Sequence, residues 1–160
     1  MDPEAKKKAL RKFTYGLYVV TAKSGDEIAA GTVTWISQAS FTPPLVMVAV
    51  KKDSHLHALV EQTRAMAISV VGVGQEAMAS AFFRSSKLEN GKMNGYAVQF
   101  GSETGAPIIT DAPAWVEVRV MGVVARGDHT VYVTEVVGAG VSDESVAPLV
   151  LANTEWTYGG

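Results

Sequence analysis

The chain has 160 residues, 48% of them hydrophobic, so it is long enough to bury a sizeable core, and we expect residues 1–160 to form a single domain. Fourteen basic and sixteen acidic residues leave a formal net charge of −2, which gives no general attraction to the phosphates of a nucleic acid. Cysteine is absent, which excludes disulfides, thiolate nucleophiles and cysteine-bound metals, so any redox chemistry requires a bound cofactor.

The chain contains no segment suited to a membrane. No run approaches the roughly 18 apolar residues that a spanning helix requires, and the N-terminal segment is charged rather than apolar. These features predict a protein of the cytoplasm with neither a membrane nor a nucleic acid as a partner.

The first elements are a short helix and a hairpin. Asp2 is suited to cap a helix with Pro3 at its first position, and the apolar spacing extends this helix to about Tyr15. Its lysines and arginines are typical of a solvated helix face rather than of a binding patch. β-branched and aromatic residues then predict a strand over 17–22, and the turn residues after it predict a hairpin partner over 27–35.

The segment from Gly31 to Val50 changes character twice. It begins as a strand, and the polar residues at 37–40 then predict a loop suited to a polar ligand. Pro43 and Pro44 predict a turn, after which residues 45–50 form an unbroken apolar strand that we expect to be buried on both faces. This order predicts a ligand held at the rim of a β-barrel.

Ser54 is predicted to cap a helix over 55–62. The free N–H groups of its first turn favour an anion, but the spacing fits a serine that serves only as the cap at least as well. His55 and His57 lack the i, i+4 spacing and carboxylate partners of a metal site, so we expect no bound metal.

A glycine motif follows the strand predicted over 65–71. The sequence from Gly72 to Ala77 fits G-x-G-x-x-A, the fingerprint of a dinucleotide-binding turn, and a helical stretch continues to Arg84. That fingerprint requires a second parallel strand, whereas residues 85–105 contain four glycines, two asparagines and little periodicity. We therefore interpret the glycines as an ordinary turn and residues 85–105 as a long loop that is either mobile or functional.

Residues 114–125 and 130–137 alternate as in a long hairpin, which places His129 at the tip of the connecting loop. Residues 148–160 predict a last short strand carrying Trp156 and Tyr158. These two amphipathic aromatics suit a dimer interface, a ligand contact or ordinary core packing.

Several of these segments resemble one known family. The pattern T-x-T-W-x-S-Q-A-S-F-x-P-P-L-V-M-V-A-V over residues 32–50 resembles the signature of the flavin reductase-like family. Further similar segments are residues 15–21, 105–109, 114–120, 127–130 and 158–160. The resemblance implies a mainly β (α+β) fold, an antiparallel, Greek-key-like split β-barrel with a short N-terminal helix and a few peripheral helices. It also implies FMN binding and a homodimer.

The resemblance assigns roles to nine residues. Thr34, Trp35 and Ser37 are expected along the flavin ring or ribityl chain, Gln38, Ala39 and Ser40 as hydrogen-bonding partners, Lys52 and Ser54 at the phosphate, and His129 as the catalytic residue that places nicotinamide. The family also places a segment comparable to 85–105 near the flavin, so one of Arg84, Lys87 and Lys92 is a further candidate for the phosphate.

The function implied is transfer of hydride from NAD(P)H to flavin. FMN is expected, FAD is not excluded by the sequence, and reduced flavin would then serve oxygen, a metal complex or a separate monooxygenase. Two alternatives stay open at this point: an FMN-binding electron-transfer protein without NAD(P)H activity, and a split-barrel module that binds a ligand other than flavin.

Overall fold

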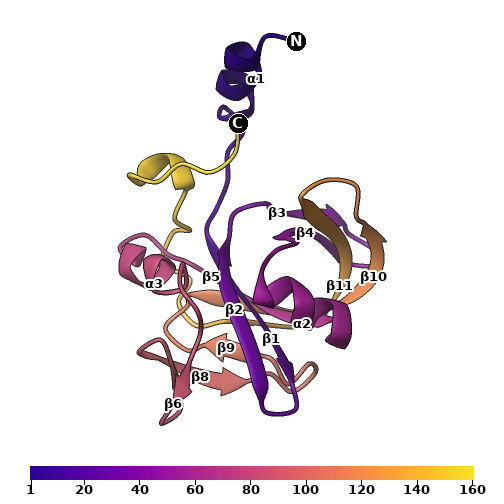
Figure 1. The fold of residues 1–160 in the computed structure, drawn as a ribbon. Coiled ribbons are helices and arrows are strands. Elements are labelled where there is room, and N and C mark those ends of the chain that lie inside the picture. The colour runs from indigo at the N-terminus through magenta and orange to yellow at the C-terminus, as the bar shows by residue number, and fades with distance from the viewer.

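Antiparallel β-strands make up most of the computed structural model, which describes all 160 residues (Figure 1). In chain order the elements are α1 (Pro3–Leu10), β1 (Tyr18–Ser24), β2 (Glu27–Val33), β3 (Ile36–Ser40), β4 (Leu45–Lys51), α2 (His55–Thr63), β5 (Ala65–Val70), α3 (Glu76–Ala81), β6 (Leu88–Glu89), β7 (Lys92–Met93), β8 (Tyr96–Phe100), β9 (Pro107–Ile109), β10 (Ala114–Val124), β11 (His129–Val141) and the 3-10 helix η1 (Leu151–Asn153).

Seven strands form the main sheet, in the order β2-β1-β5-β10-β11-β4-β3, and every pairing in it is antiparallel. The mainly β, antiparallel prediction is therefore confirmed. The edge strands β2 and β3 are joined only by Thr34 and Trp35, so the sheet has to curl until its two edges approach each other. No ladder of hydrogen bonds joins β2 to β3, and the sheet stays open along this seam.

The predicted hairpins are confirmed. β1 and β2 pair from Tyr18↔Val33 to Ser24↔Glu27 around a turn in which Gly25 has a φ of +57°. β10 and β11 form the longest pairing in the sheet, and His129 is the first residue of β11, paired with Lys51, rather than the tip of a loop.

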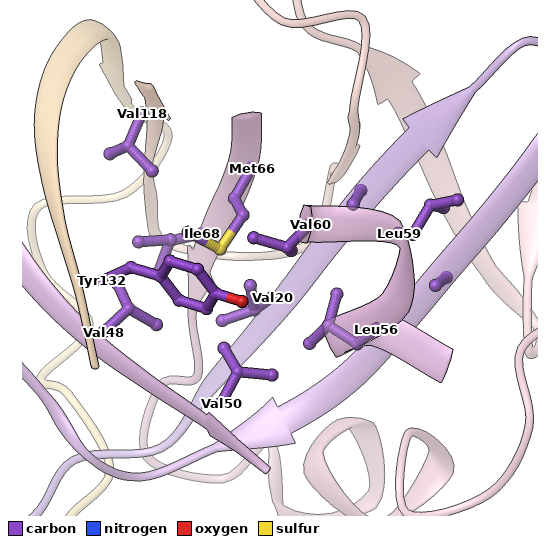
Figure 2. Close-up of a cluster of buried hydrophobic side chains, with 12 residues drawn as sticks. Val20, Val48, Val50, Leu56, Leu59, Val60, Met66, Ile68, Val118 and Tyr132 are labelled. Carbon is purple, nitrogen blue, oxygen red and sulfur yellow. The ribbon is translucent and has the colours of Figure 1, made fainter. Parts of the chain in front are cut away.

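The larger core lies between α2 and the inner face of the curled sheet (Figure 2). Leu56, Leu59 and Val60 share one face of α2 because they are spaced three and four residues apart, and all three are buried. They pack in a cluster with Tyr132, whose ring lies beside Val48 in Figure 2. Burial of each aliphatic side chain contributes about 1.5–3 kcal/mol, so this face holds α2, and with it the start of the helix, in place.

A second, four-stranded sheet has the order β6-β7-β8-β9. Three of its strands lie within residues 85–105, so the prediction of a long loop there is wrong. Two Asn-Gly pairs supply the tight turns: Asn90 and Asn94 have φ values of 52° and 48°, and the glycines after them are also positive. A two-residue turn with positive φ at both positions matches the twist of antiparallel strands, which is why such short strands form here.

Buried polar groups join the two sheets. The hydroxyl of Thr21 in β1 donates to the carbonyl oxygen of Pro107 in β9. The buried carboxylate of Glu117 in β10 accepts from Thr104 N at 2.8 Å, from Thr104 Oγ1 at 2.7 Å and from Glu103 N at 3.2 Å. Each donor offsets part of the cost of burying that charge.

The glycine motif is an ordinary turn, as predicted. Gly72 N donates to Gln75 Oε1 at 2.8 Å as the chain passes from β5 into α3, and the next strand, β6, has only antiparallel partners. The parallel strand that a dinucleotide-binding unit requires is absent.

Three other expectations differ from the structure. Asp2 caps α1 as predicted, but the helix ends at Leu10 rather than near Tyr15, because no α1 side chain is buried and the chain tightens through an i→i−3 bond from Phe13 N to Leu10 O. The polar residues at 37–40 form the edge strand β3 instead of a loop, since their backbone pairs with β4 while their side chains face solvent. The C-terminal segment forms η1 and irregular chain instead of a strand.

Candidate functional site

A cavity of about 800 Å³ opens beside the Thr34–Trp35 link. This size falls within the range of sites for small molecules and cofactors. Its wall is formed by residues of β2, of the end of β4, of the start of α2, of the chain after α3 and of the C-terminal segment. Segments distant in the sequence therefore meet here because the sheet curls.

The first turn of α2 forms one wall. Ser54 caps the helix, as predicted: its Oγ accepts from His57 N at 3.0 Å and donates to Lys51 O at 2.7 Å. Lys51, Ser54 and His55 all line the cavity. A helix start beside a lysine side chain is a favourable place for an anion, because the free N–H groups and the helix dipole carry partial positive charge.

A second cation comes from the chain after α3. Arg84, Ser85 and Ser86 line the same cavity, and Ser86 Oγ donates weakly to Ala30 O in β2 at 3.4 Å. Arg84 was one of three cations that the sequence left open, whereas Lys87 and Lys92 do not line the cavity. Guanidinium and hydroxyl donors in this position can bind phosphate oxygens.

The aromatic end of the cavity is formed by Trp35, His129 and Tyr158, and it adjoins Lys51, whose backbone pairs with that of His129. The centroid of Trp35 lies 4.6 Å from that of His129 and 5.2 Å from that of Tyr158. His129 Nε2 is 2.7 Å from the Tyr158 hydroxyl, and His129 Nδ1 is 2.8 Å from Asp128 Oδ1. The hydrogen bond and the charge of His129 hold the pKa of Asp128 below its usual value, and burial raises the pKa of Tyr158. These rings offer flat apolar surface next to the hydrogen bond between His129 and Asp128.

Two buried polar atoms have no hydrogen-bond partner in the protein. They are Thr34 Oγ1 and Trp35 Nε1, and both residues line the cavity. An unpaired buried polar group costs about 1–3 kcal/mol, and a polar ligand can remove part of that cost. Polar groups without partners, cations on two walls and flat aromatic rings fit a phosphorylated molecule with a planar ring, such as FMN.

Four of the nine predicted residues meet at this cavity: Thr34, Trp35, Ser54 and His129. The other five lie elsewhere. Ser37 and Gln38 line a separate pocket of about 210 Å³, and Ala39 and Ser40 line neither. Lys52 Nζ donates a hydrogen bond to Ala125 O at 2.8 Å. A role in cofactor binding stays a prediction for all nine.

Lys51 and Lys52 are neighbours in different surroundings. Lys51 is the last residue of β4 and lines the cavity, whereas Lys52 lies in the turn after β4, where its Nζ donates to Ala125 O. The sequence prediction named Lys52 and not Lys51. Nothing in the two adjacent lysines themselves shows which of them lines the cavity.

Comparisons with known proteins identify the family of this chain. The family model described as the flavin reductase like domain matches residues 10–160. The chain belongs to this family. The NADH:FMN oxidoreductase of Rhodococcus erythropolis is 32% identical over 145 residues, which cover 89% of this chain and 74% of the relative.

Solved structures of relatives have the same fold. The NADH:FAD oxidoreductase SgcE6 of Streptomyces globisporus C-1027 has a TM-score of 0.80 at 28% identity and covers 94% of this chain and 85% of its own. SgcE6 has also been solved with NAD and FAD fragments. The styrene monooxygenase flavin reductase of Pseudomonas putida S12 has a TM-score of 0.70 at 27% identity, with 86% of each chain covered.

Other relatives are much longer. The chain spans 24% of the length of diflavin flavoprotein A 1 of Synechocystis sp., with which it is 30% identical over 136 residues.

No helix of the chain has both the length and the apolar character of a membrane-spanning helix. No group of three or more histidine or acidic side chains is placed to hold a metal ion.

Proposed function

We propose that the chain is a flavin reductase that binds FMN or FAD in the cavity beside Thr34 and Trp35 and passes hydride to it from NADH or NADPH. The observation that carries the proposal is the cavity itself, which joins two unpaired buried polar atoms, cations on two walls and an aromatic end. The names of the R. erythropolis and S. globisporus relatives support NADH as the donor and leave both flavins open.

The anionic end of the flavin is assigned to the wall formed by Ser54 and Lys51, together with Arg84, which lines the same cavity. Ser54 caps α2, so the N–H groups of the first turn are oriented by the helix, while the Ser54 hydroxyl has to give up its bond to Lys51 O to donate to phosphate. Arg84 offers a planar set of donors that suits phosphate oxygens.

The flat part of the flavin is assigned to the aromatic end. When bound, flavin supplies the redox chemistry, because N5 of its ring accepts hydride from a reduced nicotinamide. Trp35 provides apolar surface there, and His129 provides a ring held by two hydrogen bonds, which we assign to the placement of nicotinamide. The protein needs no acid or nucleophile of its own for this reaction, only binding, orientation and exclusion of water.

The fate of the reduced flavin is a further part of the proposal. The P. putida relative is named as the reductase of a styrene monooxygenase, which supports transfer of reduced flavin to a separate monooxygenase. Oxygen or a metal complex is the alternative acceptor.

We also propose that residues 1–160 form one flavin-binding domain, a split barrel that pairs as a homodimer. The curl of the main sheet supports the barrel. Two apolar surfaces are left exposed: Phe13 beyond α1 is 64% exposed, and Met121 in β10 is 63% exposed. In Figure 1, α1 extends away from the sheets, with the C-terminus beside it. Sedimentation velocity tests the dimer, and a monomer over the whole micromolar range would contradict it.

The decisive test of the reductase is steady-state oxidation of NADH and of NADPH with and without added FMN or FAD. We expect oxidation that depends on flavin. Flavin binding without oxidation of either nicotinamide would favour the electron-transfer protein. Absence of any flavin binding would favour a module for another ligand.

A further inference from the structure

The C-terminal segment brings Tyr158 to His129 although the two residues belong to no common element. Their side chains meet through the hydroxyl and Nε2 at 2.7 Å, and Tyr158 lies 29 positions beyond His129 in the chain. His129 is the first residue of β11, whereas Tyr158 follows η1 in irregular chain. Other contacts must hold the segment around Tyr158 in place, because its backbone has no strand pairing.

That support is present on both sides of Tyr158. Before it, the Trp156 ring packs edge-on against Phe83, with centroids 5.0 Å apart. After it, Gly159 O accepts from Arg11 Nε at 3.3 Å, and a Cβ on Gly159 would lie 3.1 Å from Trp35. The segment is therefore held by contacts on both sides of the tyrosine, at Trp156 and at Gly159.

Asp128 determines which nitrogen of the neutral His129 ring carries the proton. A carboxylate only accepts hydrogen bonds, so Nδ1 of His129, 2.8 Å from Asp128 Oδ1, must carry a proton. In a neutral imidazole Nε2 is then the acceptor, and the Tyr158 hydroxyl must donate to it. The raised pKa of Tyr158 keeps that hydroxyl protonated at neutral pH.

The two bonds fix the ring in one orientation. A histidine ring held at one nitrogen can still tilt or flip, whereas bonds at both nitrogens leave one orientation with a single tautomer. Only 11% of the His129 side chain is exposed, and Trp35 packs against the ring with centroids 4.6 Å apart. A ring enclosed in this way is preorganised for contact with a ligand in the cavity.

We propose that Tyr158 is a positioning residue of this site, and that its hydroxyl holds neutral His129 as the Nδ1–H tautomer. The role of the ring in placing reduced nicotinamide rests on the proposed reductase function. The hold of Tyr158 on the ring does not, and it can be measured in the protein without any ligand.

Nitrogen-15 NMR of the histidine rings tests this contact in the full chain with Tyr158→Phe. In the unsubstituted protein, with the imidazole in its neutral form, we expect a proton on Nδ1 and a hydrogen-bonded, unprotonated Nε2. In Tyr158→Phe we expect the Nε2 resonance to move to the position of an imidazole nitrogen without a donor. His129→Asn assigns the signals against His55 and His57.

Tyr15→Phe is the matched control. Tyr15 belongs to the same aromatic group, 6.3 Å from Trp35 between centroids, but its hydroxyl donates to Leu10 O at 3.2 Å. Removal of that hydroxyl should leave the His129 resonances unchanged. A proton on Nε2 in the unsubstituted protein, or an Nε2 resonance that Tyr158→Phe does not move, would overturn the proposal.

Kinetics supply the second readout. We expect Tyr158→Phe to lower kcat/KM for NADH by about two- to tenfold, which corresponds to the loss of one neutral hydrogen bond, with flavin affinity almost unchanged and a small fall in melting temperature because Nε2 loses its partner. An unchanged kcat/KM beside a shifted Nε2 resonance would overturn the positioning role. If the unsubstituted protein oxidises no nicotinamide, the reductase proposal fails, while the NMR result still decides whether Tyr158 holds His129.

Discussion

Ser54→Ala separates two roles that coincide at the start of α2. The hydroxyl caps the helix, and we place it against the phosphate of FMN. In the ligand-free protein it accepts from His57 N at 3.0 Å and donates to Lys51 O at 2.7 Å. Alanine removes both bonds while the helix keeps its buried face of Leu56, Leu59 and Val60.

The two losses differ in size and can be measured apart. Loss of the cap should cost about 1 kcal/mol of stability, equivalent to about 2–4 °C in melting temperature for a chain of this length. A hydrogen bond to a charged group contributes about 1.5–3 kcal/mol. Because Ser54 has to give up its bond to Lys51 O when it turns to the phosphate, we expect the lower limit, about a tenfold loss of FMN affinity.

Calorimetric titration with FMN and with riboflavin tests this reasoning. Riboflavin lacks the phosphate, so its affinity should change far less than that of FMN. Ser80→Ala is the matched control, since Ser80 Oγ also donates to a backbone carbonyl three residues before it, Ala77 O at 3.1 Å, but lies outside the cavity. Equal losses for FMN and riboflavin in Ser54→Ala would refute the phosphate assignment.

Three further substitutions test other parts of the structure. Thr34→Val removes a buried hydroxyl that has no hydrogen-bond partner, so thermal denaturation should show the ligand-free protein stabilised by about 1–3 kcal/mol. Titration should show weaker FMN binding, and a lower melting temperature would contradict the expected stabilisation. Gly74→Ala places a side chain at a φ of +85°, which should cost about 1 kcal/mol in urea denaturation and leave KM for NADH unchanged. Burial and the hydrogen bond to Glu61 raise the pKa of Tyr132. The protonated Tyr132 side chain therefore contributes its full stabilisation below the usual tyrosine pKa of about 10, and this stabilisation is lost as pH rises towards the raised value. Tyr132→Phe should therefore cost about 1 kcal/mol at pH 7 and flatten the stability profile above pH 10, and an unchanged alkaline slope would contradict the assignment.

Local patterns in the sequence were enough to find the hairpins and α2. The strands β1 and β2 contain β-branched residues and flank the turn at Gly25, and Ser54 precedes an apolar face spaced three and four residues apart, so each element carries its own signal. The second sheet carried a signal too, in the pairs Asn90-Gly91 and Asn94-Gly95, which favour tight hairpins. Its strands β6 and β7 are only two residues long, too short to show alternation.

The segment that follows Pro148 was harder to predict. Its aromatic residues lie in irregular chain, and their positions are set by partners far away in the sequence: Phe83 for Trp156 and His129 for Tyr158. No periodicity in the segment itself indicates such partners. Only the curl of the sheet, which is a property of the whole chain, brings them together.

The position of the cavity has the same origin. The backbone of a strand inside a sheet pairs with a strand on each side, and its side chains alternate between the two faces. Thr34 and Trp35, which link β2 to β3, belong to neither strand and so lack this regular pairing. Trp35 O still accepts from Ala49 N at 3.0 Å, which fixes the backbone, while Thr34 Oγ1 and Trp35 Nε1 are left without partners. A curled sheet that stays open at one seam thus produces, at that seam, a rigid backbone with unpaired polar side chains. That combination suits a ligand site, and it explains why the start of α2, the chain after α3 and the C-terminal segment all meet at the seam.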